Sequence, residues 1–277
     1  MNFKIKKTVD YLLCKKPEIY ISILQFLGSK NLEKQVYLTL VDSSDRVFDI
    51  GANQGYYTSL FSNLAGKSGQ IHTFEPIPST FHRLSEMVEG ANYKNIRLSN
   101  YVVSDICQQV SMKMPGGDSG QASLREHYSG SWQASETVIH QYTCQSTTID
   151  TYIEELESQG WERERSHRSI DFLKCDVEGA ELLVLKGASR ILTRDLPVIF
   201  LEICHDWTKD YGYQPVDIVI FLEGLGYDRF YLVDKSIRPL ILKEHDLSAT
   251  SLTESSNLLC FNLDAHCRKI QRFETLI

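Results

Sequence analysis

A glycine turn near the start of the chain constrains the fold more than any other feature. Residues 47–58 read V-F-D-I-G-A-N-Q-G-Y-Y-T, so an apolar run is followed by two glycines. We expect a buried strand over residues 46–50, a tight turn, and a helix over residues 55–65. Gly51 lets a ligand come close to the main chain, and Gly55 lets the helix start tight against the sheet. The pattern predicts a ligand crevice at the carboxyl end of the strand, although an ordinary tight turn has the same glycines.

Acidic residues at two strand ends indicate which ligand the crevice takes. Asp49 stands just before the turn, and Glu75 ends the next apparent strand. An acid in the place of Glu75 is suited to holding the two hydroxyls of a ribose. Dinucleotide sites usually have three glycines, and the carboxylate of Asp49 would repel a diphosphate but attract an ammonium group. S-adenosylmethionine is a nucleoside with a cationic amino-acid tail and no phosphate. The pattern therefore favours a methyltransferase over an NAD-dependent oxidoreductase.

Other residues near these strand ends are candidates for contacts with the cofactor. Asp49 and the Gly51 turn are expected at the methionine portion. Ser104 and Asp105 follow the next strand, where they either bind the adenine edge or only stabilise a turn. The remaining candidates from the first two turns are Asn53, Gly55, Tyr56, Tyr57 and Pro76.

Composition and charge exclude several classes of function. The chain has 277 residues with 42% hydrophobic and 23% charged residues, which is ordinary for a globular protein. Its net charge of −7 disfavours nucleic acid as a partner and leaves a small-molecule acceptor. Seven cysteines without a C-x-x-C pair argue against disulfides or a zinc cluster and favour a reducing cytoplasm. No apolar run reaches transmembrane length, so we expect no stable membrane insertion. The oligomeric state stays open, a homodimer included.

The periodicity divides the chain into a helical extension over residues 1–44 and an α/β domain over residues 45–277. The extension either covers the active site or packs on one end of the sheet. In the domain, strands alternate with helices, which predicts a mostly parallel sheet with helices on both faces and a final antiparallel strand. The expected strands cover residues 46–50, 70–74, 95–98, 108–114, 141–146, 170–175, 197–203, 229–233 and 257–263. The expected helices include residues 79–89, 148–159, 178–192 and 215–225.

Residues 115–140 form a polar insertion between two of these strands. The segment is rich in glycine and serine and carries His127, Tyr128 and Trp132. Loops of this kind often bind substrates, and others are plain surface excursions. The insertion is therefore either a substrate loop or an exposed connection.

A second group of ionisable residues follows two later strands. Asp176 ends one strand, Glu178 opens the helix after it, and Glu202 and His205 stand at the end of the next strand. The helix dipole explains an acid in a first helical turn without any function, but it explains Asp176 poorly. Because carboxyl ends of parallel strands share one edge, these side chains would meet beside the cofactor crevice. We expect the reaction at this place.

Several motifs together resemble those of FkbM-type methyltransferases. They are V-F-D-I-G-A-N-Q-G-Y-Y-T at 47–58, F-E-P at 74–76, S-D at 104–105, T-T-I-D at 147–150, L-K-C-D-V-E-G-A-E at 173–181, K-G-A at 186–188 and L-E-I at 201–203. The resemblance spans residues 45–235. It implies a Rossmann-like, seven-stranded class I methyltransferase sheet that uses S-adenosylmethionine. It also implies O-methylation of a secondary metabolite, a sugar or a lipid-like acceptor.

Methyl transfer to a hydroxyl requires alignment of donor and acceptor and removal of a proton. His205 is the preferred base because a neutral imidazole accepts a proton near pH 7, and Glu178 is the alternative. In catechol-type methyltransferases, which share this general fold, carboxylates at the strand ends chelate a divalent ion. Asp176, also a candidate cofactor contact, and Glu202 would do so here. Ile203 stands where a further ligand is wanted, so a metal is not favoured. A non-catalytic module with this fold is the third alternative.

Overall fold

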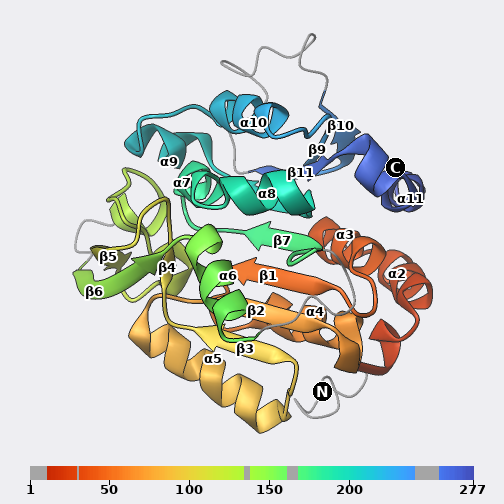
Figure 1. Cartoon of the computed structure of the whole chain (residues 1–277), viewed down its shortest axis with the longest axis horizontal. Coiled ribbons are helices and arrows are strands. Elements are labelled where there is room, and N and C mark those ends of the chain that lie inside the picture. Colours follow the sequence, from red (N-terminus) through yellow and green to blue (C-terminus); the bar gives the residue numbers. More distant parts are fainter. Residues whose placement is uncertain (1–10, 30, 134–137, 161–167, 241–255) are drawn as a thin grey trace.

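The computed structural model describes residues 11–29, 31–133, 138–160, 168–240 and 256–277. Their centre is an eight-stranded sheet with the order β10-β9-β11-β8-β7-β1-β2-β3 (Figure 1). Strands β3, β2, β1, β7 and β8 run parallel, whereas β11 runs antiparallel between β8 and β9. The bounds are β1 Arg46–Ile50, β2 Gln70–Phe74, β3 Ile96–Ser99, β7 Phe172–Cys175, β8 Val198–Ile203, β9 Arg229–Val233, β10 Ile237–Pro239 and β11 Ser256–Phe261.

The expected α/β sheet with an antiparallel last strand is confirmed, but its strand number differs by one. The additional strand is β10, which pairs antiparallel with β9 at the edge of the sheet. It ends at Pro239, which has no N–H to donate, and an edge strand tolerates this because one side of its ladder is unpaired. A short edge strand also leaves little backbone open to pairing with other chains.

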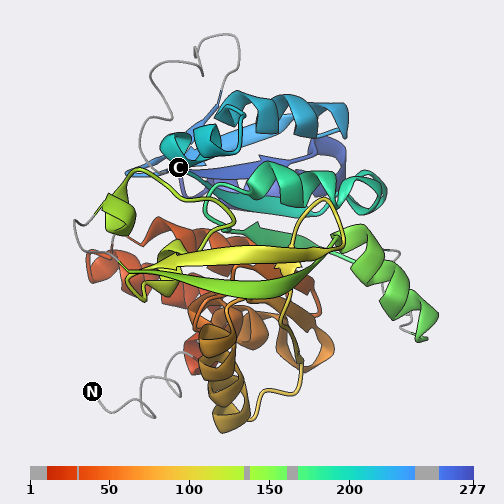
Figure 2. The same ribbon diagram turned by 90° about the vertical axis from the view of Figure 1, so that its left-hand side faces the viewer.

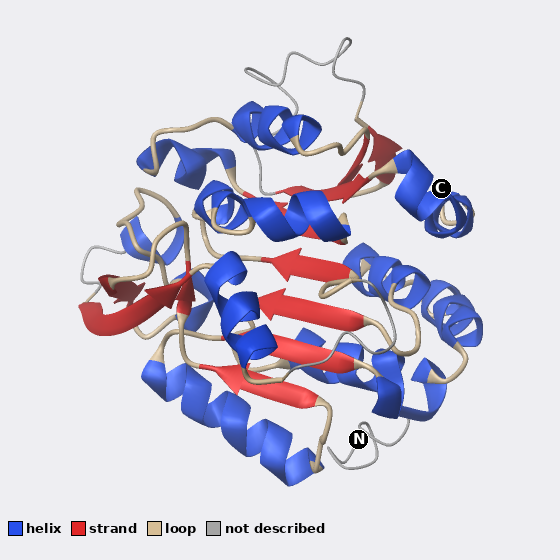
Figure 3. Cartoon of the chain, viewed as in Figure 1, coloured by secondary structure: helices blue, strands red, loops and turns tan. Residues whose placement is uncertain are grey.

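Helices cover both faces of the sheet (Figure 3). On one face, α6, α7, α8 and α10 share a core with Phe48 and Ile50 of β1. On the other face, α3, α4 and α11 share a core with Val47. Successive residues of β1 therefore serve opposite cores, as the pleat of a strand requires. The helices are α2 Pro17–Phe26, α3 Leu32–Leu40, α4 Tyr56–Ala65, α5 Pro78–Ala91, α6 Ile149–Ser158, α7 Glu181–Lys186, α8 Ser189–Asp195, α9 His205–Asp210, α10 Pro215–Gly224 and α11 Leu263–Glu274.

None of the helices in the described ranges has both the length and the apolar character needed to cross a bilayer.

The helix expected over residues 178–192 is two helices, α7 and α8, which meet at Gly187. A side chain at Gly187 would lie 2.0 Å from the backbone oxygen of Ser104, so the main chain of another segment passes directly beside this junction. The first helix starts at Glu181, and Glu178 belongs to the turn before it.

The described residues of the N-terminal extension pack against the α/β domain. All residues of α3 from Lys34 to Leu40 are buried. Tyr37 is fully buried and packs edge-on against Tyr57, Phe61, Phe172 and Phe200. Such aromatic pairs add about 0.5–1.5 kcal/mol each beyond their burial. Helix α3 therefore packs on one face of the sheet beside α4.

A second, small sheet carries the polar insertion. It consists of β4 (Val102–Val103), β6 (Ile139–Thr147) and β5 (Gln109–Pro115), and it faces the viewer in Figure 2. Strands β5 and β6 pair antiparallel, which confirms the two strands expected on either side of the insertion. Between them, residues 116–133 form a connection with two short 3₁₀ turns. Residues 134–137 of the predicted insertion lie outside the described part of the chain.

Candidate active site

The turn after β1 brings three strand ends together. The backbone N–H groups of Gly51 and Ala52 both donate to the carbonyl oxygen of Phe74 at the end of β2. Gly51 has a φ of 76°, and a Cβ there would lie 1.7 Å from the backbone oxygen of Asp176 after β7. Gly55 also has positive φ and caps α4, but a side chain there would collide with Met87 of α5. Gly55 thus permits contact between two helices, whereas the sequence predicted contact with the sheet.

Glu75 is held in one orientation by the main chain around it. Its Oε2 accepts the N–H of Asn53 at 3.0 Å, and its Oε1 accepts the N–H of Ile77 at 2.9 Å. Burial raises the pKa of Glu75 to about 7, and the two N–H groups partly oppose this rise. Each carboxylate oxygen retains a further lone pair. Glu75 is therefore a fixed acceptor for hydroxyl groups of a ligand.

A buried ion-pair cluster lies beneath the first turn. Asp49 Oδ2 accepts the hydroxyl of Thr58 at 2.6 Å, and Asp49 Oδ1 lies 3.6 Å from Lys174 Nζ. The same Nζ lies 3.0 Å from Asp176 Oδ2. Burial lowers the pKa of Lys174, but the carboxylates of Asp176 and Asp49 outweigh it and raise the pKa above its ordinary value. Lys174 therefore stays charged and neutralises the acids at this edge of the sheet.

The turn after β7 presents Glu178 in an unusual backbone conformation. Glu178 has a φ of 57°, in the left-handed region that residues with side chains rarely adopt. Burial raises its pKa far above the ordinary value, and the nearby carboxylates of Asp176 and Glu202 raise it further. The expectation that Glu178 opens the following helix is wrong, because that helix begins three residues later at Glu181.

A cleft of about 620 Å³ lies between these two turns and the insertion. Asn53, Glu75, Asp176 and Glu178 line it together with apolar residues. The insertion also contributes, since Ser119 donates its hydroxyl to Asn53 Oδ1 at 3.0 Å. The other lining residues are Ile50, Gly51, Phe74, Pro76, Tyr101, Val102, Val103, Met112, Gly120, Ala122, Leu124, Val177 and Ala180. The insertion thus forms part of the wall of the predicted cofactor crevice.

Several predicted cofactor contacts do not line this cleft. Asp49 points into the ion-pair cluster beneath it. Ser104 donates to Asp105 Oδ1 at 3.1 Å, while the preceding residues of that segment line the cleft instead. Tyr57 donates its hydroxyl to Glu33 Oε2 at 2.6 Å, and the side chain of its neighbour Tyr56 is exposed.

Two of the four predicted catalytic residues do not line the cleft. Glu202 lies on β8 opposite Asn257 of β11. His205 is the first residue of α9, and its Nε2 lies 3.2 Å from Gln214 Oε1. Asp176 and Glu178 line the cleft, but Glu202 and His205 do not. In the described ranges, no group of three or more His, Cys, Asp or Glu side chains is arranged to hold a metal ion.

Lys174 and Thr58, which hold Asp49, were not among the residues predicted from the sequence. A signal was present for one of them: Lys174 occupies an inward position in a strand that otherwise reads Phe-Leu-Cys. A buried lysine needs a counter-ion, and Asp49 and Asp176 were already suspected at adjacent strand ends. Thr58 carried no such signal, because a threonine in a helix is ordinary.

The cleft suits S-adenosylmethionine. Glu75 is placed for ribose hydroxyls, and the apolar surface of Tyr101, Val102 and Val103 suits a nucleobase. Gly51 allows the main chain to approach closely. The sheet is doubly wound, has one inserted antiparallel strand, and carries this crevice at its carboxyl edge. These features define the class I, S-adenosylmethionine-dependent methyltransferases.

Comparison with known families places the chain within this class. Residues 49–229 match the methyltransferase FkbM domain, and the chain belongs to this family. It is 27% identical over 167 residues to the 2-O-methyltransferase NoeI of Sinorhizobium fredii, a match that covers 60% of this chain and 67% of NoeI. A protein-L-isoaspartate O-methyltransferase of Methanococcus maripaludis is 28% identical over 58 residues, which are 21% of this chain and 27% of that protein.

Two solved structures are similar to this chain at low sequence identity. Methyltransferase FkbM from Methylobacillus flagellatus matches with a TM-score of 0.48 and 15% identity, over 79% of this chain and 44% of that chain. Fibrillarin from Aeropyrum pernix, solved with natively bound S-adenosyl-L-methionine, matches with a TM-score of 0.42 and 14% identity, over 80% of this chain and 68% of that chain. The chain thus spans less than half of the length of the FkbM structure.

Proposed function

We propose that this chain methylates a hydroxyl oxygen of a small-molecule acceptor, such as a secondary metabolite, a sugar or a lipid-like compound. The observation that carries this proposal is that Glu178, a buried carboxyl group of raised pKa, lines the same cleft as Glu75. An acceptor hydroxyl must lose its proton as it is methylated, and a basic carboxylate beside it takes up that proton. The 2-O-methyltransferase activity named for NoeI supports oxygen as the acceptor atom.

In this proposal, different residues of the cleft bind different parts of the cofactor. Glu75 accepts the ribose hydroxyls, and Gly51, Asn53 and Asp176 surround the methionine portion. When bound, the sulfonium supplies an electrophilic methyl group. The chain aligns the acceptor oxygen with that group, and the walls contributed by the insertion exclude water. Asp176, although paired with Lys174, directs its negative charge toward the region of an incoming ammonium group.

We assign the general base to Glu178 in preference to His205. Glu178 lines the cleft, whereas His205 faces Gln214 outside it. A carboxylate whose ionised form is destabilised by burial is a stronger base than one in water. The positive charge of the cofactor stabilises the ionised form of Glu178. Cofactor binding therefore favours loss of the proton that the Glu178 carboxyl group carries in the free protein. The carboxylate then accepts the proton of the acceptor hydroxyl.

The proposed acceptor is small, and the proposed compartment is the cytoplasm. A net charge of −7 opposes attraction of nucleic acid. All seven cysteines are free thiols, which is the usual state in a reducing compartment.

Calorimetry with S-adenosylhomocysteine tests the cofactor site. We expect Glu75→Ala to weaken binding by about 1–3 kcal/mol, because a charged hydrogen-bond acceptor is removed. Glu86→Ala is the matched control, since Glu86 is an exposed glutamate on the following helix. Equal affinities of wild type and Glu75→Ala would reject the ribose assignment.

Binding of NAD in place of S-adenosylhomocysteine would support the oxidoreductase alternative. Transfer of label from a tritiated methyl donor to a panel of hydroxyl compounds then identifies the acceptor class.

A further inference from the structure

Glu178 requires support from outside its own turn. Its positive φ is unfavourable for a residue with a Cβ, and such conformations persist only where the surroundings hold them. Gly179 follows with a φ of 98°, and a side chain there would lie 2.9 Å from the ring of Tyr211. The turn after β7 is therefore pressed against α9 and the residues that follow it.

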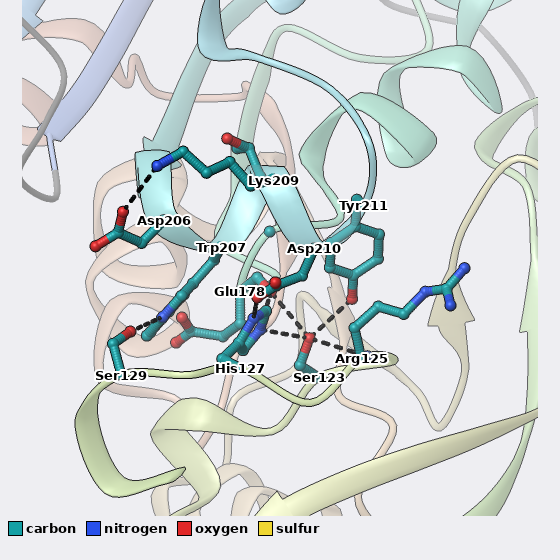
Figure 4. Close-up of polar contacts among 12 residues, drawn as sticks. Ser123, Arg125, His127, Ser129, Glu178, Asp206, Trp207, Lys209, Asp210 and Tyr211 are labelled. Atoms are coloured by element: carbon teal, nitrogen blue, oxygen red, sulfur yellow. Dashed lines mark hydrogen bonds and ion pairs between the residues drawn. The ribbon is translucent and has the colours of Figure 1, made fainter. Parts of the chain in front are cut away.

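The carbonyl oxygen of Glu178 is the centre of a buried polar cluster (Figure 4). It accepts the hydroxyl of Ser123 at 2.9 Å and lies 3.0 Å from Nε2 of His127. Ser123 and His127 are both in the insertion, and both are almost completely buried. The Tyr211 hydroxyl lies 2.8 Å from Ser123 Oγ and accepts the N–H of Leu124 at 3.1 Å. The insertion is thus bonded directly to the turn that carries Glu178.

The donors and acceptors of this cluster form one consistent set. His127 Nε2 faces a carbonyl oxygen, which only accepts, so this nitrogen carries a proton. His127 Nδ1 lies 2.7 Å from Asp210 Oδ2 of α9. Tyr211 donates to Ser123, which in turn donates to Glu178. In this arrangement both lone pairs of the Glu178 carbonyl are used, and Asp210 holds the other side of the imidazole ring.

The ring of His127 is also held by packing. It stacks on Trp207 of α9 with ring centroids 4.9 Å apart and planes 16° from parallel. The indole N–H of Trp207 donates to Ser129 of the insertion at 2.8 Å. These contacts join the insertion to α9 (Figure 4). The imidazole therefore has little freedom to leave the Glu178 carbonyl.

A hydrolytic role for this serine, histidine and aspartate is excluded by access. The Ser123 side chain is fully buried, so no substrate carbonyl reaches its oxygen. Its proton is already donated to the Glu178 carbonyl, whereas a nucleophilic serine gives its proton to the histidine. The cluster therefore acts on the Glu178 turn itself.

We infer that Ser123, His127 and Tyr211 are positioning residues that hold the Glu178 backbone so that its carboxyl group stays desolvated in the cleft. This inference rests on the proposed function, in which Glu178 is the base. It assigns a second task to the insertion: the segment that forms one wall of the cleft also orients the carboxylate opposite the cofactor. The contact acts through the main chain, so it leaves the carboxylate free to exchange protons with an acceptor.

Carbon-13 NMR of the full chain, labelled at the glutamate side-chain carboxyl, tests this inference without an acceptor. The Glu178 signal is the one absent from Glu178→Gln. In wild type we expect it to titrate at higher pH than exposed glutamates. We expect Ser123→Ala and Tyr211→Phe to move its midpoint at least about one pH unit toward the ordinary range, because a relaxed turn lets water reach the carboxyl group. Two variants are used so that a folding defect in one does not decide the result.

Ser129→Ala is the matched control, because Ser129 joins the same insertion to the same helix but does not touch Glu178. We expect its Glu178 midpoint to equal that of wild type. Equal midpoints in wild type, Ser123→Ala and Tyr211→Phe would overturn the positioning inference. A wild-type midpoint in the ordinary glutamate range would instead overturn the choice of Glu178 as base, which is a failure of the proposed function. Circular dichroism of each variant confirms that the fold is retained.

Discussion

The turns after β1 and β7 lie against each other at the carboxyl edge of the sheet, yet they obtain their shapes differently. In the first turn, positive φ falls on Gly51 and Gly55, which have no side chain, and on Asn53, a residue type that adopts the left-handed region more readily than most. In the second turn, Glu178 itself has positive φ, and contacts from the insertion hold it there. The first shape is thus encoded locally, whereas the second depends on residues about fifty positions away. A strained residue is retained where its side chain faces the cleft.

The acids beside the two turns differ in the same way. Glu75, next to the first turn, accepts two backbone N–H groups, and its pKa rises to about 7 through burial. Glu178 is buried too, but neighbouring carboxylates at Asp176 and Glu202 add to the effect of burial. The main chain thus stabilises the charge of Glu75, whereas the surroundings of Glu178 oppose a charge. This difference suits one carboxylate to binding and the other to proton transfer.

The largest effect is expected from Gly51→Ala, which destroys the contact between the two turns. The new Cβ would lie 1.7 Å from the Asp176 backbone oxygen, and the positive φ would remain. Backbone atoms cannot move aside as a flexible side chain does. We expect a loss of more than about 4 kcal/mol in the free energy of unfolding and no detectable cofactor binding. Thermal unfolding and calorimetry with S-adenosylhomocysteine measure both.

Gly90→Ala is the control for that experiment. Gly90 lies in α5 with open space around its Cα, and alanine favours helix by up to about 1 kcal/mol. We expect unchanged cofactor affinity and equal or higher stability. Normal cofactor affinity in Gly51→Ala would show that the turns do not need this close approach.

The next largest effect is expected from substitution of the two candidate bases. We expect Glu178→Gln to reduce turnover by roughly 10²–10⁴-fold, as for removal of a general base, and His205→Ala to reduce it less than about tenfold. Initial rates with the acceptor found in the methyl-transfer screen provide the measurement, and cofactor affinity serves as the control. The opposite order of effects would restore His205, which the sequence favoured. Loss of activity with EDTA and its recovery with magnesium would instead support a metal held by Asp176 and Glu202.

The smallest effect is a pH dependence from Glu75. Its pKa is about 4.5 in the unfolded chain and about 7 in the folded chain. Its stabilising contribution is therefore fully present below pH 4.5 and is lost as the pH rises through about 7. We expect the stability of wild type relative to Glu75→Gln to fall by about 1–3 kcal/mol between these pH values. Urea unfolding at pH 4.5, 6 and 8 measures the difference. A difference that rises with pH would show that the backbone N–H groups outweigh burial.

The prediction of the fold succeeded where the signal is local. Strands β1, β2 and β9 occupy the predicted residues, and the last strand of the sheet is antiparallel as expected. An apolar run of strand length and the glycine after it can be recognised from a short stretch of neighbouring residues. The prediction of one helix over residues 178–192 failed because the helix begins at Glu181 and breaks at Gly187, where the backbone of Ser104, distant in sequence, passes close by.

The candidate site was predicted in part for the same reason. Position at a strand end indicated Glu75, Asp176 and Glu178, and all three line the cleft. It did not distinguish them from Asp49, whose carboxylate points toward Lys174 beneath the turn. Side-chain direction depends on the pleat and on partners from other strands, and neither is visible in a single motif.

By itself, the sequence determined the class of fold, the glycine turn after β1 and the presence of acids at several strand ends. The hydrophobic periodicity and the conformational freedom of glycine are properties of short segments. They can therefore be read directly from the order of the residues. Only the tertiary structure decided that Glu178 faces the cleft and His205 does not, and that the insertion reaches back to hold the Glu178 carbonyl. Burial, ion pairing and support of a strained backbone arise from segments that meet only after folding, and they decide the protonation of each carboxylate.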